Sequence, residues 1–167
     1  MVAGEGEGRC ALSDTRPQVD GRDPGDAIAG MVEHVLELAS TWLAWEGKPI
    51  PGLGREYTPH KAIRRVGDHM IDHLAQLDAR FAGVPSLPDE WHGSTVTTAA
   101  DMAPFTQEDL DEARSRLRRL AQIWKIRLRD VPASDMDVAG DEYTVREIAF
   151  CAIESGTYAD AIGRLGE

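Results

Sequence analysis

Apolar residues recur at intervals of three and four along most of this chain, and this spacing is the feature that most narrows its fold. Between Asp26 and Trp45 they share a single helical face, made of Ile28, Met31, Val32, Val35, Leu38, Ala39 and Trp42. Such a stripe is typical of an amphipathic helix that packs against other elements. The proline and glycine residues of KPIPGLG (48–54) end this first predicted helix.

A second helix is predicted to begin at Thr58 and Pro59. Thr58 can cap free backbone N–H groups, and Pro59 loses no hydrogen bond at the first helical position. Gly83, followed by Pro85, ends the helix. Its apolar face consists of Ile63, Val66, Met70, Leu74, Leu77 and Phe81.

Two sequence signatures mark the starts of a third and a fourth helix. Each places a threonine three residues before an acid, which is the pattern of a capping box: Thr106 with Asp109, and Thr144 with Glu147. The apolar faces are Leu110, Ala113, Leu117, Leu120, Ala121, Trp124 and Leu128 in the third helix, and Ile148, Cys151, Ala152, Ser155, Ala159 and Ile162 in the fourth. No strand-like alternation stands out. The sequence therefore predicts an all-α protein, an antiparallel four-helix bundle.

Two segments fall outside these helices. Residues 1–24 are rich in Gly, Asp, Arg and Pro, which predicts a disordered or loosely attached N-terminal tail before a bundle domain at 25–167. Residues 84–105 form a long connection, and loops of this length often border a binding site. Trp91 and His92 in this connection are candidates for the mouth of a pocket.

Composition limits the classes of partner. A net charge of −11 argues against nucleic acid, because phosphate binding needs clustered Lys and Arg. No apolar run is long enough to span a membrane, and the N-terminus does not resemble a signal peptide. Cys10 and Cys151 form neither a CxxC pair nor a disulfide framework, which favours a reducing, cytoplasmic setting.

The stretch DHMIDHLAQL (68–77) places His69 and His73 one helical turn apart, each directly after an aspartate. This spacing lets both rings bind one metal ion, and the adjacent Asp68 and Asp72 could orient them. His73 is expected at the edge of the apolar stripe, and His69 further round toward solvent. The alternative is that both histidines are boundary residues hydrogen-bonded to neighbours. Both interpretations stay open.

The inner face of the fourth helix carries three more candidates. Cys151 is either a small buried apolar residue or a thiolate that acts as ligand or nucleophile. Ser155 and its small neighbours would leave a cavity facing His69 or His73, suited to a small molecule. Tyr158, at the edge of the stripe, would contribute a phenol to that cavity.

One further histidine, His34, lies on the flank of the first helical stripe. It is either a hydrogen-bonded boundary residue or a contributor to a binding site. A tryptophan on each of the first and third helices would serve a homodimer interface.

The strings YTPHKAIRRVGDHMIDHLAQLDARFAG (57–83) and YTVREIAFCAIES (143–155) resemble the DinB/YfiT-like superfamily of small four-helix bundles. That group includes mycothiol-dependent maleylpyruvate isomerase and bacillithiol S-transferases. The resemblance covers about residues 27–166. It implies a zinc or nickel ion held by three histidines, one from the second helix and an HxxxH pair from the fourth. Such a metal would activate a low-molecular-weight thiol for attack on a small electrophile.

Carried onto this chain, the resemblance places metal ligands at His69 or His73, and at Cys151 and Ser155. The HxxxH pair is absent, and serine is a poor zinc ligand, so a three-histidine site cannot be built. An altered site would combine His69 or His73 with Cys151 and a contribution from His34. A lost site would leave only the pocket. The expected function is a transferase or isomerase acting on a small molecule, or a non-catalytic small-molecule-binding or interaction protein on the same fold.

Overall fold

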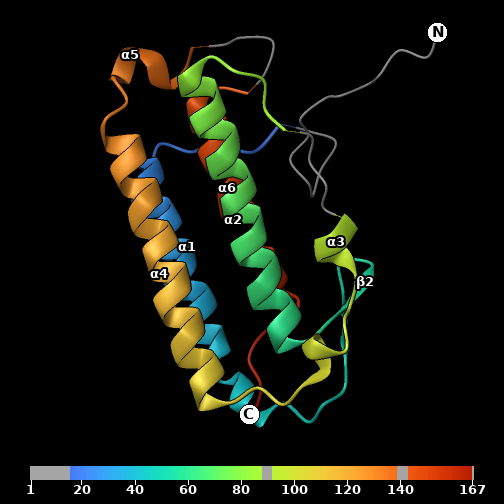
Figure 1. Cartoon of the computed structure of the whole chain (residues 1–167). Helices are drawn as coiled ribbons and strands as arrows, with labels where there is room; N and C mark the ends of the chain where they lie inside the picture. Colours follow the sequence, from blue (N-terminus) through green and yellow to red (C-terminus); the bar gives the residue numbers. More distant parts are fainter. Residues whose placement is uncertain (1–15, 88–91, 139–142, 167) are drawn as a thin grey trace, which may run out of the picture.

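The computed structural model describes residues 16–87, 92–138 and 143–166, with the side chains at 92 and 93 excepted. The molecule is mostly helical (Figure 1). The four longest helices are α1 (Pro24–Ala39), α2 (Pro59–Ala82), α4 (Gln107–Arg129) and α6 (Val145–Glu154). The shorter elements are η1 (Trp42–Ala44), β1 (Ile50–Gly52), β2 (Arg55–Tyr57), α3 (His92–Thr95), η2 (Ala100–Met102), α5 (Ala133–Met136) and α7 (Thr157–Asp160). Within the described ranges, no helix has the length and apolar character needed to cross a membrane.

The four long helices do not all alternate in direction. Figure 1 shows α1 and α6 running one way, and α2 and α4 the other. At 1.5 Å per residue, the 24 residues of α2 span about 36 Å, and the chain must return over this length before α4 begins. Residues 84–105 make this return. The expectation of alternating antiparallel helices is therefore wrong for α2 and α4, and the long connection has a topological cause.

The predicted helix ends are confirmed where capping signals stood in the sequence. The Thr58 side chain accepts a hydrogen bond from the Lys61 N–H at the start of α2, and Gly83 ends that helix with a left-handed backbone, φ 64°. Both predicted capping boxes form, with reciprocal side-chain and backbone bonds: Thr106 with Asp109, and Thr144 with Glu147.

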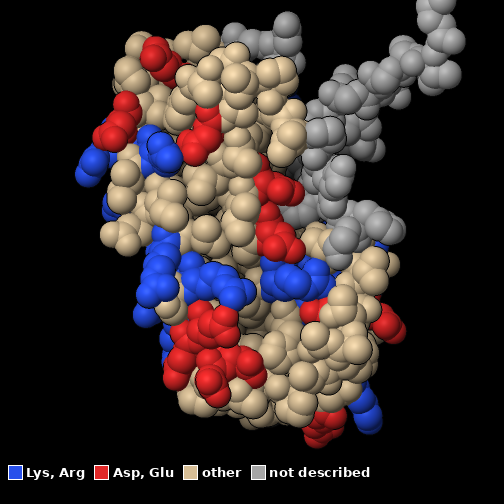
Figure 2. All heavy atoms as spheres, in the orientation of Figure 1, with Lys and Arg blue, Asp and Glu red and all other residues tan. Residues whose placement is uncertain are grey.

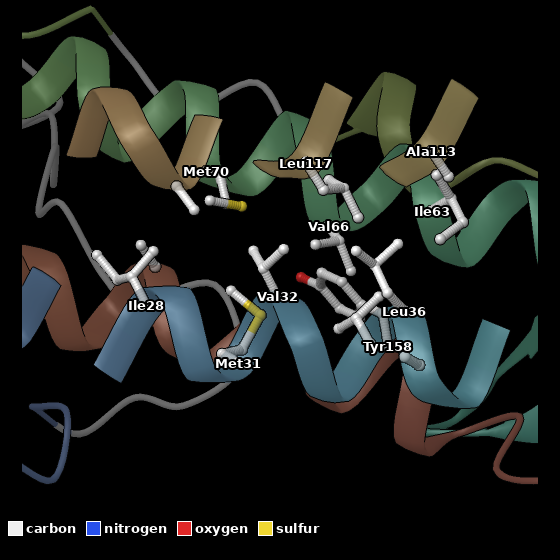
Figure 3. Packing of buried hydrophobic residues seen from close by; sticks show 14 of the residues in the cluster. Ile28, Met31, Val32, Leu36, Ile63, Val66, Met70, Ala113, Leu117 and Tyr158 are labelled. Carbon is white, nitrogen blue, oxygen red and sulfur yellow. The ribbon is translucent and has the colours of Figure 1, made fainter. Parts of the chain in front are cut away.

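Two helices end earlier than predicted. The first ends at Ala39 rather than near Trp45. The fourth was expected to run to Ile162, but α6 ends at Glu154 and a short turn leads into α7. Gly156 lies in this turn, and a Cβ atom there would meet Cγ of Met31 at 2.9 Å. The turn therefore packs closely on α1, and α7 carries Tyr158 into the interior among Val32, Leu36 and Val66 (Figure 3).

A two-stranded hairpin was not expected. β1 and β2 pair antiparallel, with Ile50 opposite Tyr57. The turn residues Leu53 and Gly54 both have positive φ, 50° and 69°, as two-residue hairpin turns require. Each strand has only three residues, too few to show alternation. The hairpin places the Tyr57 side chain in the core, fully buried.

The contact between α1 and α4 forms a large part of the apolar core, which also includes residues of α2 and α6 (Figure 3). Most of its buried residues follow the predicted stripes: Ile28, Met31, Val32 and Val35 from α1, and Leu110, Ala113, Leu117, Ala121, Trp124 and Leu128 from α4. Leu36 of α1 is also buried there, although it was not in the predicted stripe. Trp42 and Trp124 are fully buried, and their indole N–H groups donate to the carbonyls of Gly163 and Met70. These two rings are therefore not available for the proposed dimer face.

Ion pairs line the outside of this contact. Arg118 lies 2.8 Å from Glu33, and Lys125 lies 2.6 Å from Asp26. Figure 2 shows basic and acidic side chains interspersed across the face that α2 and α4 share. The exposed charges thus join α1 to α4 around an apolar interior.

The face of α2 differs from its prediction. Ile63, Val66, Met70 and Leu77 are buried as expected, but Leu74 is half-buried and Phe81 is 48% exposed. Phe81 lies in the last turn of α2. The interior instead takes up polar residues of the same helix, which form the site described below.

The connection between α2 and α4 is fixed to α2 by charge. Arg64 donates to both oxygens of the buried Asp101 carboxylate and to the carbonyls of Ser94 and Val96. The Thr58 hydroxyl donates to the carbonyl of Asp101 at 2.6 Å. These contacts hold residues 94–101 against the N-terminal half of α2.

The N-terminal segment is described only from residue 16. Arg16 pairs with Glu147 at 2.8 Å, Pro17 is buried, and residues 18–23 lead to the start of α1. The predicted disorder of the tail concerns residues 1–15, which lie outside the described ranges.

Candidate active site

Four polar side chains of α2 are buried at strict four-residue intervals: Lys61, Arg65, His69 and His73. Residues at this spacing lie on one ridge of a helix. Each is at most 6% exposed. We call them the polar row. It packs against Tyr57 of β2 and Tyr158 of α7, which are both fully buried.

A continuous series of hydrogen bonds runs along this row, and we call it the relay. Nη2 of Arg65 donates to the Tyr158 hydroxyl at 3.2 Å, and that hydroxyl lies 3.1 Å from Nδ1 of His69. Nε2 of His69 lies 3.1 Å from Nε2 of His73. Nδ1 of His73 lies 2.9 Å from Oε1 of Gln76. The relay therefore joins a guanidinium, a phenol, two imidazoles and an amide.

The Gln76 oxygen determines the direction of the proton donors, because an amide oxygen only accepts. Nδ1 of His73 then donates to Gln76, and Nε2 of His73 accepts from Nε2 of His69. Nδ1 of His69 accepts from the Tyr158 hydroxyl. Within the relay, each neutral imidazole then donates one hydrogen bond and accepts one.

A second arrangement satisfies the same contacts. If the Gln76 amide turns its NH₂ group toward His73, every donor between Gln76 and Tyr158 reverses. A hydrogen-bonded series with two such arrangements can pass a proton from one end to the other.

Burial keeps both imidazoles neutral. It lowers the pKa of His69 to about 3, aided by the neighbouring His73 and opposed by a hydrogen bond to the Cys151 backbone. Burial also lowers the pKa of His73, and the bond to Gln76 acts against this shift. Neutral imidazoles at pH 7 can both accept and donate protons, as a relay requires.

Arg65 is a buried cation whose hydrogen-bonded partners are phenols. Nη1 donates to the Tyr57 hydroxyl at 2.7 Å, and the guanidinium carbon lies 4.0 Å from the centre of the Tyr158 ring. Nε of Arg65 is buried, and no hydrogen-bond partner for it occurs in the described part of the chain. A buried cation whose hydrogen bonds within the described ranges go to neutral groups is costly, and it stabilises any negative charge that forms beside it. Tyr158 lies in that position.

Lys61 extends the positive charge of the polar row. Its ammonium donates to the carbonyl of Glu56 at 2.7 Å and to the Thr97 hydroxyl at 2.8 Å, and burial lowers its pKa. Sequence reasoning overlooked Lys61, Arg65, Tyr57 and Gln76. The four-residue spacing from 61 to 73 was the available signal.

The structure brings three of the predicted site residues together: His69, His73 and Tyr158. The expectation that His69 faces solvent is wrong, because its side chain is fully buried against Tyr158. His73 is the more exposed of the two rings, at 6%.

Cys151 is disulfide-bonded, so its sulfur is not available here as a thiolate ligand or nucleophile. The chain's other cysteine, Cys10, lies outside the described ranges. The sequence predicted no disulfide framework for Cys10 and Cys151, and the bond at Cys151 departs from that prediction. Ser155 is buried, and its hydroxyl donates to the Ala152 carbonyl at 2.7 Å.

The remaining candidates lie elsewhere. His34 is on the surface, where its Nε2 lies 2.7 Å from an oxygen of Asp160. It is therefore a boundary residue rather than part of the polar row. Trp91 and the side chain of His92 lie outside the described residues. Asp68 lies 3.9 Å from Arg64, and burial raises its pKa.

The donor set does not fit the three-histidine metal centre that the resemblance implies. The Nε2 atoms of His69 and His73 face each other at 3.1 Å, which suits two ligands of one ion. However, the Cys151 sulfur is in a disulfide, and the Ser155 hydroxyl is bonded within its own helix. Among the described residues, no group of three His, Cys, Asp or Glu side chains could hold a metal. We therefore derive no step through a metal or a metal-activated thiol.

The described residues line two pockets, and neither is the cavity expected beside the histidines. One, of about 510 Å³, lies between the ends of α2 and α4 and the start of α6. The other, of about 330 Å³, lies between α1 and α4. Neither is lined by His69 or His73. The outer end of the relay is at His73, the more exposed of the two rings at 6%.

Comparisons with protein-family models, with curated proteins and with solved structures found no match to this chain.

Proposed function

We propose that this chain is a DinB-like four-helix bundle that acts as a metal-free acid–base enzyme, an isomerase that moves a proton on a small molecule. The relay from Arg65 through Tyr158 and His69 to His73 is the observation that carries the proposal. The DinB-like assignment rests on the two sequence strings, and on α1, α2, α4 and α6 packing around one core.

In the proposed reaction, protons move along the relay between a substrate at His73 and the Tyr158 hydroxyl. His73 donates its Nδ1 proton to a substrate atom at the outer end. A proton from Nε2 of His69 then moves to Nε2 of His73, and the Tyr158 hydroxyl proton moves to Nδ1 of His69. The negative charge remains on the Tyr158 oxygen, beside the Arg65 guanidinium. Removal of a proton from another position of the substrate reverses these steps, so atoms and charge balance over one turnover.

Each group has a separate role in this scheme. His73 is the catalytic residue, because it meets the substrate. Tyr158 and His69 store and pass the proton, and Arg65 stabilises the phenolate. General acid–base catalysis of this kind contributes typically about 10²- to 10⁴-fold to a rate.

Proton exchange provides a test that does not need the natural substrate. The full chain in D₂O is mixed with a panel of small keto acids and ketones, and deuterium incorporation next to the carbonyl is followed by NMR. We expect the wild type to accelerate exchange of at least one compound. Tyr158→Phe and His73→Gln should lower that rate by about 10²-fold or more.

His34→Gln is the matched control, because His34 is a surface histidine paired with Asp160. It should exchange protons at the wild-type rate. If the wild type accelerates no compound of the panel, or if Tyr158→Phe is as fast as the wild type, the proposal fails.

A non-catalytic binding protein on the same fold is the second candidate. The full burial of His69 and Tyr158 favours it, because a closed relay meets no substrate. It predicts saturable binding of a small molecule with no proton exchange in the same panel.

A further inference from the structure

The ends of α2 and α4, the start of α6 and the short helix α5 lie together at one end of the molecule (Figure 1). Their residues line the pocket of about 510 Å³. We call it the end pocket. Its volume lies within the range of small-molecule sites. Its lining is Arg80, Phe81, Arg127, Asp130, Val131, Pro132, Asp135, Val138 and Val145. None of these residues belongs to the relay.

Arg80 contributes a fixed positive charge to the end pocket. Its Nη1 donates to the Tyr143 carbonyl at 2.8 Å, and its Nη2 donates to the Val138 carbonyl at 3.0 Å. Carbonyl oxygens hold a guanidinium in place, but they do not neutralise it. Three of its five N–H groups remain for other acceptors.

The other charges of the pocket are matched or solvated. Arg127 pairs with Asp78 at 3.3 Å, and Asp130 pairs with Arg129 at 3.2 Å. Asp135 is exposed and accepts a bond from Ser134 at 3.0 Å, so water screens its charge. Half-buried Arg80 is therefore the charge that a ligand would meet.

Apolar side chains complete the lining. Val145 is buried, whereas Phe81 and Val138 are 48% and 50% exposed. Large side chains this exposed next to a hollow gain free energy when a ligand covers them. An apolar body attached to one negative group matches both features.

We propose that the end pocket binds an apolar monocarboxylate of small-molecule size. The carboxylate accepts from Arg80, in the manner of guanidinium–carboxylate pairs. The hydrocarbon part packs on Phe81 and Val138. This inference is independent of the relay and of the proposed isomerase.

Calorimetric titration of the full chain with octanoate tests the proposal. We expect saturable binding with one site per chain. Octan-1-ol and octylamine, which have the same hydrocarbon length without the negative charge, should bind at least about ten-fold more weakly.

Two variants locate the site. Val138→Glu places a negative charge on an exposed lip of the pocket, and should weaken octanoate binding by at least about ten-fold. Arg80→Gln should weaken it as well. Val96→Glu is the matched control, because Val96 is similarly exposed and does not line the pocket.

Three results would overturn the proposal. They are the absence of saturable octanoate binding, equal affinity for octanoate and octylamine, and a Val138→Glu variant that binds as well as Val96→Glu. Circular dichroism of each variant shows whether it remains folded, so a lost signal can be assigned to the pocket.

Discussion

Two contacts between helices in this molecule are equally buried and opposite in chemistry. Where α1 meets α4, the interior is apolar and the ion pairs, such as Arg118 with Glu33, lie outside. Where α2 meets α7, the interior holds Arg65, His69 and Tyr158, hydrogen-bonded to one another. Burial alone therefore does not separate a stabilising core from a candidate site. Buried titratable groups mark the difference.

We expect the largest change in the free energy of unfolding at the apolar contact between α1 and α4. Leu117→Ala removes a fully buried side chain of α4 and should lower the free energy of unfolding by about 2–5 kcal/mol. Urea unfolding followed by circular dichroism measures this. The rate of proton exchange per folded molecule should not change. If Leu117→Ala lowered the free energy of unfolding by less than Tyr158→Phe does, the α2–α7 contact would be the more stabilising of the two, contrary to our assignment.

We expect a smaller loss of folding stability at the polar contact between α2 and α7. Tyr158→Phe removes the hydroxyl that accepts from Arg65 and meets His69, so two buried groups lose a partner. We expect the free energy of unfolding to fall by about 2–3 kcal/mol, at about 1–1.5 kcal/mol for each. The same urea measurement applies. An unchanged midpoint would mean that water replaces the hydroxyl, and that the site is open.

Acid should weaken the polar contact selectively. The pKa of His69 is lowered to about 3 by burial, whereas an unfolded histidine titrates near 6.5. Between these values the unfolded chain binds more protons, so stability is lost as pH falls below about 6.5. For His69 alone, the free energy of unfolding should drop by about 2 kcal/mol between pH 7.5 and pH 5.

Urea midpoints at these two pH values, compared with those of His69→Gln, isolate this contribution. The comparison is needed because burial raises the pKa values of Asp68, Asp72 and Glu154, and these carboxyls respond to acid with the opposite sign. A pH dependence that is the same in the variant and the wild type would contradict the burial of a neutral His69.

The smallest effect is expected outside the apolar contact. Arg118→Gln removes an exposed ion pair with Glu33, which water and salt already screen. The urea midpoint should not shift measurably at physiological salt. A clear loss would show that the exposed charges contribute to the α1–α4 contact as much as its interior does.

The sequence was informative where local chemistry decides the structure. Capping boxes at Thr106 and Thr144 predicted the starts of α4 and α6, and apolar stripes predicted the core of α1 and α4. These signals depend on residues within one helix. They do not depend on what packs against it.

The candidate site was only partly predictable for the same reason. His69, His73 and Tyr158 were identified as candidates, but His69 was expected to face solvent. A stripe analysis assigns polar residues to the outside unless their partners are known. Here the partners, Tyr57 and Tyr158, lie 101 residues apart in sequence. One belongs to a three-residue strand and the other to a four-residue helix. No local pattern encodes that meeting.

The polar row also constrains how α2 can turn about its own axis. Its residues occupy one ridge, and the buried apolar Val66 and Met70 occupy a neighbouring ridge. A slip of one residue would rotate α2 by about 100° and carry Arg65 and His69 away from the two tyrosines. The hydrogen bonds of the polar row therefore fix the rotation of α2 about its own axis. If apolar residues replaced the whole polar row, we expect α2 to be less restricted in its rotation about its own axis.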